Sequence, residues 1–323
     1  MQQKKCNLKL YSNFLLANHN RYSATELERV APVDLAHDAV TRFLTREDFT
    51  PSDLWNEVKP LVCVTSGYLV GDDSLLDKRY SRKNELAKVQ YSGNEHDLLN
   101  GIAIVNLLWA RGRKCVPVDY RVYEKARDDK TKNGHFDEML DKAEKRGFTP
   151  DYVLMDTFYA RVTTLKHIAK KGWKWIASLK ENRQVSVTKG LYISVSHLDF
   201  AKAPVKQVWL KEYGTVLVSK LVTKDGDVTY LATNDLEIPD KQSLKRHWQY
   251  RWDIEEFHRG IKQTTGIEQC EARKAAPSRT HIFAAFVAYV KMEKRRWKEK
   301  VSWYEQKAEI TRPGARAYLL ANA

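Results

Sequence analysis

Two aspartates of the sequence lie where α/β sheets commonly carry out chemistry. Asp72, with Asp73 beside it, closes the apolar run 67–71, and Asp156 closes the apolar run 152–155. A carboxylate at the carboxyl end of a central strand points into the crevice where such sheets bind ligands. Taken singly, each aspartate is more simply explained as the start of a loop or as a helix cap. Their significance therefore depends on a third group.

The segment 243–263 supplies that group, because its spacing predicts a helix with one ionisable stripe. At about 100° per residue, with Arg251 at zero, Glu255 falls at about 40°, His258 at about −20° and Lys262 at about 20°. A core-facing apolar stripe lies beside these residues and consists of Tyr250, Ile254, Phe257 and Ile261. The segment thus predicts an acid and two cations on one helix face.

The same helical geometry distinguishes two neighbouring acids. Glu256 falls at about 140°, away from the ionisable stripe, so Glu255 is the predicted functional acid. The alternative is a solvated face in which Arg251 and Glu255 form an i,i+4 ion pair worth a few tenths of a kcal/mol. Asp72 and Asp156 upstream make the functional interpretation the stronger one.

Three carboxylates converging in a basic protein suggest a divalent metal. Magnesium prefers oxygen ligands and takes few of them from protein, which leaves positions for phosphate oxygens and water. Two such ions about 3.5–4 Å apart can activate an attacking oxygen and stabilise the leaving oxygen of a phosphodiester. The sequence has no glycine-rich phosphate loop, no His-Glu-x-x-His, no Gly-x-Ser-x-Gly and no zinc spacing among its nine histidines.

The elements that must position these residues read as an α/β fold of ribonuclease-H-like type. Expected strands at 101–109, 115–122, 152–156 and 173–179 alternate with helices at 136–146 and 162–171, which predicts a mixed sheet flanked by helices. The predicted parts are a helical N-terminal domain (1–62) with DNA contact, the first part of the core (63–183), a β-rich insertion (184–238), the acid-bearing helix and end of the core (239–298), and a C-terminal tail (299–323).

Composition narrows the partner. The 323 residues include 55 Lys and Arg against 41 Asp and Glu, a formal charge of +14, and 43% are hydrophobic. This mix excludes a disordered or low-complexity chain, and the cationic excess favours a polyanion, most commonly nucleic acid. An anionic membrane or an acidic protein is the alternative, but no apolar stretch approaches the roughly 20 residues of a membrane span. A cytoplasmic protein without a membrane partner is expected.

Two segments rich in cations are further candidates for DNA contact. They are 78–83 and 291–298, although a solvated charged face is the more common explanation for such runs. Trp297 and Trp303, which lie among charged residues near the C-terminus, could stack on bases or pack the tail.

At this point the sequence resembles a known family, the DDE transposases of bacterial insertion sequences. The branch marked by the signature Tyr-x2-Arg-x3-Glu-x6-Lys is matched by Trp248, Arg251, Glu255 and Lys262. Three of the four positions agree in type and spacing. Trp248 stands where the family usually has tyrosine, which puts any role of that hydroxyl in doubt but not the acid.

Three upstream segments add to the resemblance. Residues 68–74 resemble the strand of the first aspartate, whose pattern of Asp, any residue, then Ser or Thr selects Asp72, with Asp73 as the fallback. Residues 153–159 resemble the strand of the second aspartate, and 175–183 resemble the Lys-x-Asn-Arg stretch that follows. The resemblance covers about residues 65–290.

The resemblance implies a ribonuclease-H-like core in which Asp72, Asp156 and Glu255 hold two Mg²⁺ ions, with Mn²⁺ as a substitute. Water would cut double-stranded DNA at a transposon end, and the freed 3′-hydroxyl would attack target DNA. The implied DNA-binding residues are Arg251, Lys262, Trp248, His258, Lys180 and Arg183. A homodimer assembled on DNA and a bacterial, nucleoid-associated location are also implied.

Two alternatives remain open. The first is a nuclease of the same fold that hydrolyses DNA without strand transfer. The second is a non-catalytic DNA-binding protein descended from a transposase, against which the intact set of three acids argues.

Overall fold

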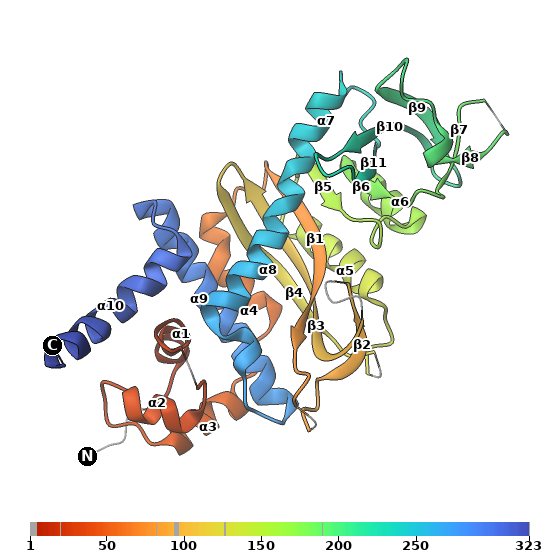
Figure 1. The fold of residues 1–323 in the computed structure, drawn as a ribbon. Helices are drawn as coiled ribbons and strands as arrows, with labels where there is room; N and C mark the ends of the chain where they lie inside the picture. The colour runs from red at the N-terminus through yellow and green to blue at the C-terminus, as the bar shows by residue number, and fades with distance from the viewer. Residues whose placement is uncertain are drawn as a thin grey trace.

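The centre of the molecule is a sheet in which five strands form the predicted core (Figure 1). The computed structural model describes residues 5–19, 21–81, 83–93, 97–125, 127–188 and 190–322. The core strands are β1 (Tyr68–Asp77), β3 (Asp97–Arg111), β4 (Lys114–Tyr123), β5 (Tyr152–Met155) and β6 (Trp175–Leu179). Their spatial order is β4-β3-β1-β5-β6; the first three are antiparallel, and β5 and β6 run parallel to β1. This mixed sheet confirms the ribonuclease-H-like prediction.

The register of the sheet places Asp72 level with Asp156. Gly71 is the last residue of β1 that pairs with β5, directly opposite the last residue of β5. The prediction that Asp72 ends its strand is wrong, because β3 keeps pairing with β1 as far as Asp77. What ends at Gly71 is the pairing with β5, so the sheet opens beside Asp72.

The predicted β-rich stretch continues this same sheet. The strands β7 (Gln184–Ser186), β8 (Ile193–Ser194), β9 (Val205–Leu210), β10 (Gly214–Val222) and β11 (Val228–Thr233) follow β6. β11 pairs antiparallel with β6, and β10, β9, β7 and β8 follow in that order. β2 (Lys88–Ser92) pairs with the start of β3, and η2 (Val195–His197) is a short 3₁₀ turn.

One face of the sheet is covered by α5 (Lys132–Lys145) and α6 (Val162–Lys170). Phe136 lies so close to Gly71 that a Cβ there would meet its Cε2 atom at 2.1 Å, so only glycine fits directly before Asp72. α5 begins earlier than the predicted residue 136, because the Thr131 hydroxyl caps it by accepting from the Gly134 amide at 3.1 Å.

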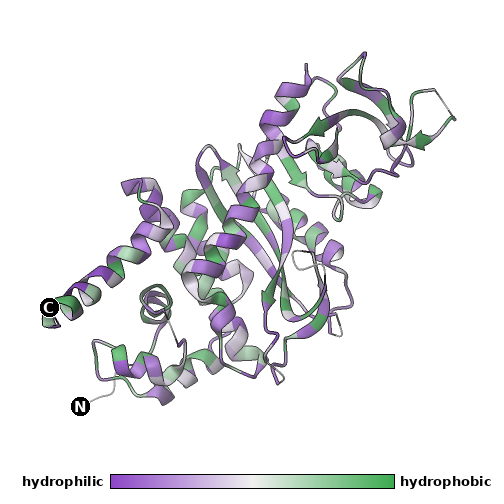
Figure 2. Cartoon of the chain, in the orientation of Figure 1, coloured by the Kyte–Doolittle hydropathy of each residue, from purple (hydrophilic) through white to green (hydrophobic). Residues whose placement is uncertain are grey.

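The other face is covered by α8 (Trp252–Thr265) and α9 (Ala275–Glu299). The ring of Phe286 on α9 stacks on Tyr120 of β4 at 4.5 Å and lies 5.9 Å from Phe257 of α8. Figure 2 shows much of α8 and the preceding helix as hydrophilic, while Ile254, Phe257 and Ile261 are buried. The apolar stripe predicted for this helix is therefore confirmed.

The predicted single helix over 243–263 is wrong at its centre. The chain forms α7 (Lys241–Trp248), a 3₁₀ turn η3 (Gln249–Arg251) and then α8. This change of pitch lets Tyr250 stack on Tyr68 at 4.1 Å, while His247 Nδ1 lies 2.7 Å from the Tyr68 hydroxyl. The start of α8 is thereby attached to β1, the strand that carries Asp72.

The N-terminal residues are helical as predicted and pack on α9. They form α1 (Leu8–Ala17), α2 (Ala24–Val30), α3 (His37–Arg46), α4 (Pro51–Val58) and η1 (Lys59–Leu61); residues 1–4 of the predicted domain lie outside the described part. Phe49 stacks on Phe283 at 4.4 Å, and the Tyr11 hydroxyl lies 2.9 Å from His281 Nδ1. These helices and the sheet share one hydrophobic core.

The predicted C-terminal tail is mostly helix. After η4 (Ile267–Gln269) and α9, α10 spans Trp303–Ala321, and Ala323 is outside the described residues. Trp303 packs on Gly260 of α8, where a Cβ would meet its ring at 2.8 Å, and its indole donates to Glu293. Trp303 thus packs the helix instead of presenting a free ring. Among the described residues, no helix has the length and apolar character needed to cross a bilayer.

Candidate active site

The three predicted acids line one cavity of about 1,050 Å³. Asp72 comes from β1, Asp156 from the residue after β5, and Glu255 from the first turn of α8. We call this cavity the carboxylate cleft. Its lining also includes Asp73, Asp77, Glu268, Arg79, Lys132, Arg251, Arg259, Lys262, His258, Trp252 and Phe158.

Asp72 is an acid held largely away from water. Its side chain is 16% exposed, and its Oδ2 accepts a hydrogen bond from Arg251 at 3.0 Å. Burial raises the pKa of Asp72 to about 7, a rise that Arg251 opposes and the carboxylates of Asp156 and Asp73 reinforce. A carboxylate whose ionisation is made costly by neighbouring acids is one that a cation would stabilise.

Asp73, the fallback ligand, is already engaged. Its Oδ1 accepts from the Tyr159 hydroxyl at 2.9 Å, and its Oδ2 accepts from the ammonium of Lys132 at 2.7 Å. Both oxygens therefore have donors on the α5 side of the cleft. Asp72 is the better candidate, because its contact with Arg251 links it to Glu255.

The Asp156 carboxylate is fixed by backbone amides of the residues that follow it. Oδ1 accepts from the amides of Phe158 at 3.0 Å and Tyr159 at 3.2 Å, while no described residue donates to Oδ2. Burial raises the pKa of Asp156, against Arg251 and these amide hydrogen bonds, which lower it. One oxygen is thus anchored and the other is left for a ligand.

Arg251 joins the acids of β1 and α8. Besides its contact with Asp72, its Nη1 donates to Glu255 Oε1 at 2.7 Å. Glu255 is 43% exposed, so this end of the cleft is open to solvent. Glu256 is exposed and does not line the cleft, in agreement with the helical geometry.

His258 enters the cleft as a neutral ring. Burial lowers its pKa to about 3, with a further lowering from Lys262 and Arg251. Its Nε2 lies 3.0 Å from the amide nitrogen of Asn106, the β3 partner of Asp72. His258 therefore contributes a hydrogen-bonding ring to the cleft and no positive charge at neutral pH.

Lys262, the signature lysine, has protein partners. Its ammonium donates to the Leu75 carbonyl at 2.7 Å and lies 3.3 Å from Glu268 Oε1. These contacts hold α8 against the second half of β1 and leave the lysine at the edge of the cleft.

Three predicted DNA-binding residues lie outside the carboxylate cleft. Trp248 packs partly buried against the core. Lys180 and Arg183 line a neighbouring hollow of about 410 Å³, which shares Phe158 with the cleft. The structure therefore does not bring these three residues to the acids, although Lys180 and Arg183 line the adjoining hollow.

In each of the two basic segments, one lysine contacts other elements of the protein. In 78–83, Lys78 is buried and donates to the carbonyls of Glu268 and Cys270 at 2.7 Å, and Arg82 is outside the described residues. In 291–298, Lys291 donates to Ser12 and Asn13 of α1, at 2.7 and 2.8 Å. Lys78 and Lys291 therefore hold elements together.

Sequence reasoning missed several residues of the cleft, among them Trp252, Arg259 and Lys132. Trp252 and Arg259 fall at about 100° and 80° on the same helical wheel, so a wider stripe would have included them. Trp252 is 55% exposed. Lys132 carries no such signal, because it reaches Asp73 from the start of a helix 59 residues further along the chain.

The donor set of the cleft fits a divalent cation, with one rearrangement. Carboxylate oxygens are the ligands that Mg²⁺ prefers, and Asp72 and Glu255 already share a cation in the guanidinium of Arg251. Within the described residues, no group of three or more His, Cys, Asp or Glu side chains is close enough to hold an ion as it stands. Arg251 must move for Asp72 and Glu255 to share one.

Comparison with known families decides the classification. The model of the transposase DDE domain matches residues 87–291, well over half of the chain. The chain belongs to this family. The match includes Asp156 and Glu255 and begins after Asp72.

Membership confirms the predicted transposase and its fold. Transposases of this family act on DNA and generally use divalent metals. A search of curated proteins gave no match. The Tyr-Arg-Glu-Lys branch stays a prediction.

Proposed function

We propose that this transposase cleaves DNA at transposon ends in a magnesium-dependent reaction and joins the freed 3′-hydroxyl to target DNA. Asp72, Asp156 and Glu255 are the proposed ligands of two Mg²⁺ ions, for which Mn²⁺ can substitute. The observation that supports this most is their convergence, from three separate segments, on one cleft where burial raises the pKa of both aspartates.

Two in-line phosphoryl transfers make up the reaction. In the first, a water oxygen attacks phosphorus and the bond to the 3′-oxygen breaks, which leaves a 3′-hydroxyl and a 5′-phosphate. In the second, that hydroxyl attacks a target phosphodiester and displaces its 3′-oxygen. In each step the attacking oxygen gives a proton to solvent, and the displaced 3′-oxygen takes one up to become a hydroxyl. Bound magnesium supplies activation of the attacking oxygen and stabilisation of the leaving one.

The chain itself must position DNA. We propose that Arg251 leaves Asp72 and Glu255 for a DNA phosphate, since a guanidinium binds carboxylate and phosphate with the same planar geometry. Arg259 and Lys262 at the cleft edge add cations on the same helix. Trp252, 55% exposed, offers a ring for a base at the mouth.

Lys180 and Arg183 extend this DNA surface in the hollow that shares Phe158 with the cleft. Burial lowers the pKa of Arg183, while Glu212 raises it, and one of its terminal nitrogens is buried without a hydrogen-bond partner among the described residues. Such a donor suits a phosphate oxygen. We further propose that two copies of the chain, located with the bacterial nucleoid, bridge two transposon ends.

The proposal is tested with purified protein, Mg²⁺ and a DNA fragment that includes the inverted repeats flanking the gene. Joined products support a transposase reaction in full. Products that are cut and never joined would support the related nuclease, and bound DNA with neither product would support a non-catalytic binding protein.

A matched pair of variants tests the site. Glu255→Gln removes a proposed ligand and is expected to abolish cleavage while leaving DNA binding nearly intact. Glu256→Gln changes the neighbouring exposed acid and is expected to stay within about twofold of the wild type, as surface substitutions usually do. Equal activity of Glu255→Gln and wild type would refute the assignment.

A further inference from the structure

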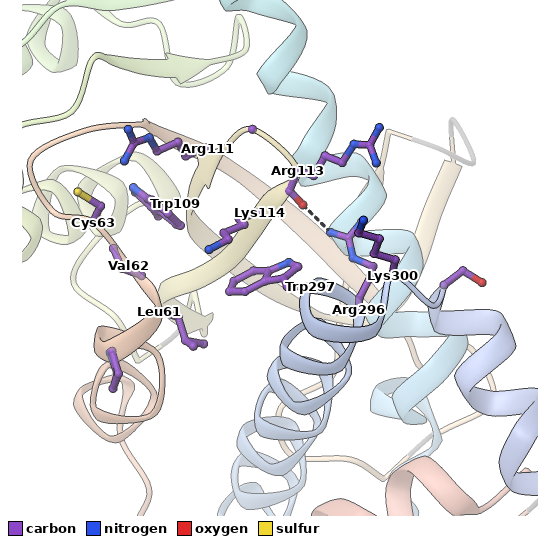
Figure 3. Close-up of a pocket in the computed structure, with 13 residues that line it drawn as sticks. Leu61, Val62, Cys63, Trp109, Arg111, Arg113, Lys114, Arg296, Trp297 and Lys300 are labelled. Atoms are coloured by element: carbon purple, nitrogen blue, oxygen red, sulfur yellow. Dashed lines mark hydrogen bonds between the residues drawn. The ribbon is translucent and has the colours of Figure 1, made fainter.

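A second cavity, of about 820 Å³, is lined by cations and tryptophan (Figure 3). Three separate segments build it: residues 60–63 after α4, the β3–β4 turn, and the end of α9 with the residues that follow. Its cations are Arg111, Arg113, Lys114, Arg296 and Lys300. We call this cavity the basic hollow.

The cations of the basic hollow have little opposing charge. Within the described chain no acid lines it, and of its five cations only Arg296 has a carboxylate partner, the buried Glu293 at 2.8 Å. Some cations elsewhere on the surface are paired, as Arg295 is with Glu299 and Glu309. The excess charge is therefore a local feature of the hollow that a polyanion would neutralise.

Hydrogen bonds to the backbone hold the segments of the basic hollow together. A terminal nitrogen of Arg296 donates to the Arg113 carbonyl at 3.1 Å, which ties the β3–β4 turn to α9 (Figure 3). Lys300 closes α9 in a left-handed conformation, and its amide donates to the Arg296 carbonyl at 2.9 Å. A ligand would thus find the Arg296 guanidinium already positioned.

The hollow also contains a platform for stacking. The Lys114 ammonium lies 5.3 Å from the centre of the Trp297 ring, and Trp297 is only partly buried. A positively charged groove that also contains an aromatic side chain is a combination that nucleic-acid-binding proteins use. The volume has room for more than one phosphate group.

The basic hollow is distinct from the carboxylate cleft. The two cavities share no lining residue. Tyr68 pairs with Ala110 beside the hollow, whereas Asp72 pairs with Asn106, four residues or about 13 Å further along the strands. This offset along the strands is less than one duplex turn of about 34 Å, so a single DNA duplex is long enough to reach both cavities.

We propose that the basic hollow binds the phosphodiester backbone of duplex DNA as a second DNA site, separate from the carboxylate cleft. This inference takes DNA as the partner from the proposed function, and it is independent of the chemistry of the three acids. Arg113 and Lys114 contact phosphates, and Trp297 packs against the adjoining sugar.

The first test measures how DNA affinity depends on salt. Arg113→Ala with Lys114→Ala removes two phosphate contacts from an exposed turn, so the slope of log affinity against log salt should fall by about 2. Lys166→Ala with Lys170→Ala removes the same charge from exposed positions of α6 and should leave the slope unchanged. Equal slopes for the two double variants would overturn the proposal.

The second test uses Cys63, which lines the hollow. Hydrogen bonds with Ser66 and Thr65 lower the pKa of this thiol, whereas Cys6 and Cys115 are buried. Alkylation of Cys63, followed by mass spectrometry, should slow severalfold when duplex DNA is added. The Arg113→Ala, Lys114→Ala variant should lose this protection.

Controls separate the sources of failure. Glu255→Gln should keep the protection of Cys63, because it changes only the carboxylate cleft. If the wild type cleaves DNA but DNA does not protect Cys63, this inference is overturned and the proposed function stands. If DNA protects Cys63 but is not cleaved, this inference stands and the proposed function is contradicted. Protection by free tripolyphosphate, with none by DNA, would also overturn the second DNA site.

Discussion

The carboxylate cleft and the basic hollow both border β3 and differ in how their charge is balanced. The cleft has six acids and five Lys or Arg in its lining, and Arg251, Lys132 and Lys262 are all paired with acids there. The hollow has five cations and, in the described chain, no acid. The cleft is thus close to neutral by itself, whereas the hollow carries an excess of positive charge that a ligand would neutralise.

This difference teaches what each cavity is suited to do. Acids that share a low-dielectric space raise one another's pKa and favour a cation between them, which is a requirement of metal-dependent phosphoryl transfer. Cations without acids favour a phosphate backbone and supply no chemistry. Substitutions in the cleft should therefore impair catalysis, and substitutions in the hollow should impair DNA binding, each without the other.

The largest expected effect is on cleavage. Asp72→Asn should lower the cleavage rate by about 1,000-fold, because loss of a metal ligand removes several kcal/mol of transition-state stabilisation. Asp73→Asn changes the neighbouring acid, which already has two protein donors, and should be much milder. A larger loss for Asp73→Asn in a single-turnover assay would reverse the choice of ligand.

The second prediction concerns pH. The pKa of Asp72, raised to about 7 by burial, means that the folded protein binds a proton more tightly than the unfolded chain. The metal-free protein should therefore lose stability as pH rises from about 4 to 7, by up to about 4 kcal/mol at 1.4 kcal/mol per pKa unit.

Comparison with a variant isolates this effect. In denaturant unfolding, the free energy of unfolding of Asp72→Asn relative to the wild type should increase as pH rises through that window. Above that window the difference should stay constant. The Arg113→Ala, Lys114→Ala variant should follow the wild type, because arginine and lysine do not titrate there. A constant difference between Asp72→Asn and wild type would contradict the raised pKa.

The smallest expected effect is a thermal shift. Inorganic phosphate near its dissociation constant should raise the melting temperature of the wild type by about 1 °C through the basic hollow. The Arg113→Ala, Lys114→Ala variant should show less of a rise, and Glu255→Gln should show the full one. A full rise in the hollow variant would place the anion elsewhere.

Much of the fold could be predicted because hydrophobic pattern follows local geometry. The strands around Val105 and Leu154 and the buried stripe of Ile254 and Phe257 all appear as the pattern predicts. What the pattern missed depends on pairing between distant segments. β1 continues past Asp72 because β3 pairs with it, and the helix before Glu255 tightens at η3 where Tyr250 meets Tyr68.

In the candidate site, too, local spacing predicted some residues, and contacts between distant segments were missed. Spacing on one helix selected Glu255 over Glu256, and the structure turns only Glu255 into the cleft. Spacing could not show that Arg251 bridges Asp72 and Glu255, since this contact joins residues 179 apart. Spacing flagged the basic segment 291–298 and Trp297, but it could not show that they meet residues 60–63 and the β3–β4 turn, which carry no motif, to form the basic hollow.

The most direct test is a crystal of the protein with transposon-end DNA and Mn²⁺, in which anomalous scattering locates the ions. The account predicts Mn²⁺ peaks in contact with the carboxylates of Asp72, Asp156 and Glu255, with the Arg251 guanidinium moved from these acids to a DNA phosphate. Ions bound elsewhere, or Arg251 still bridging Asp72 and Glu255 in a complex that cleaves DNA, would contradict it.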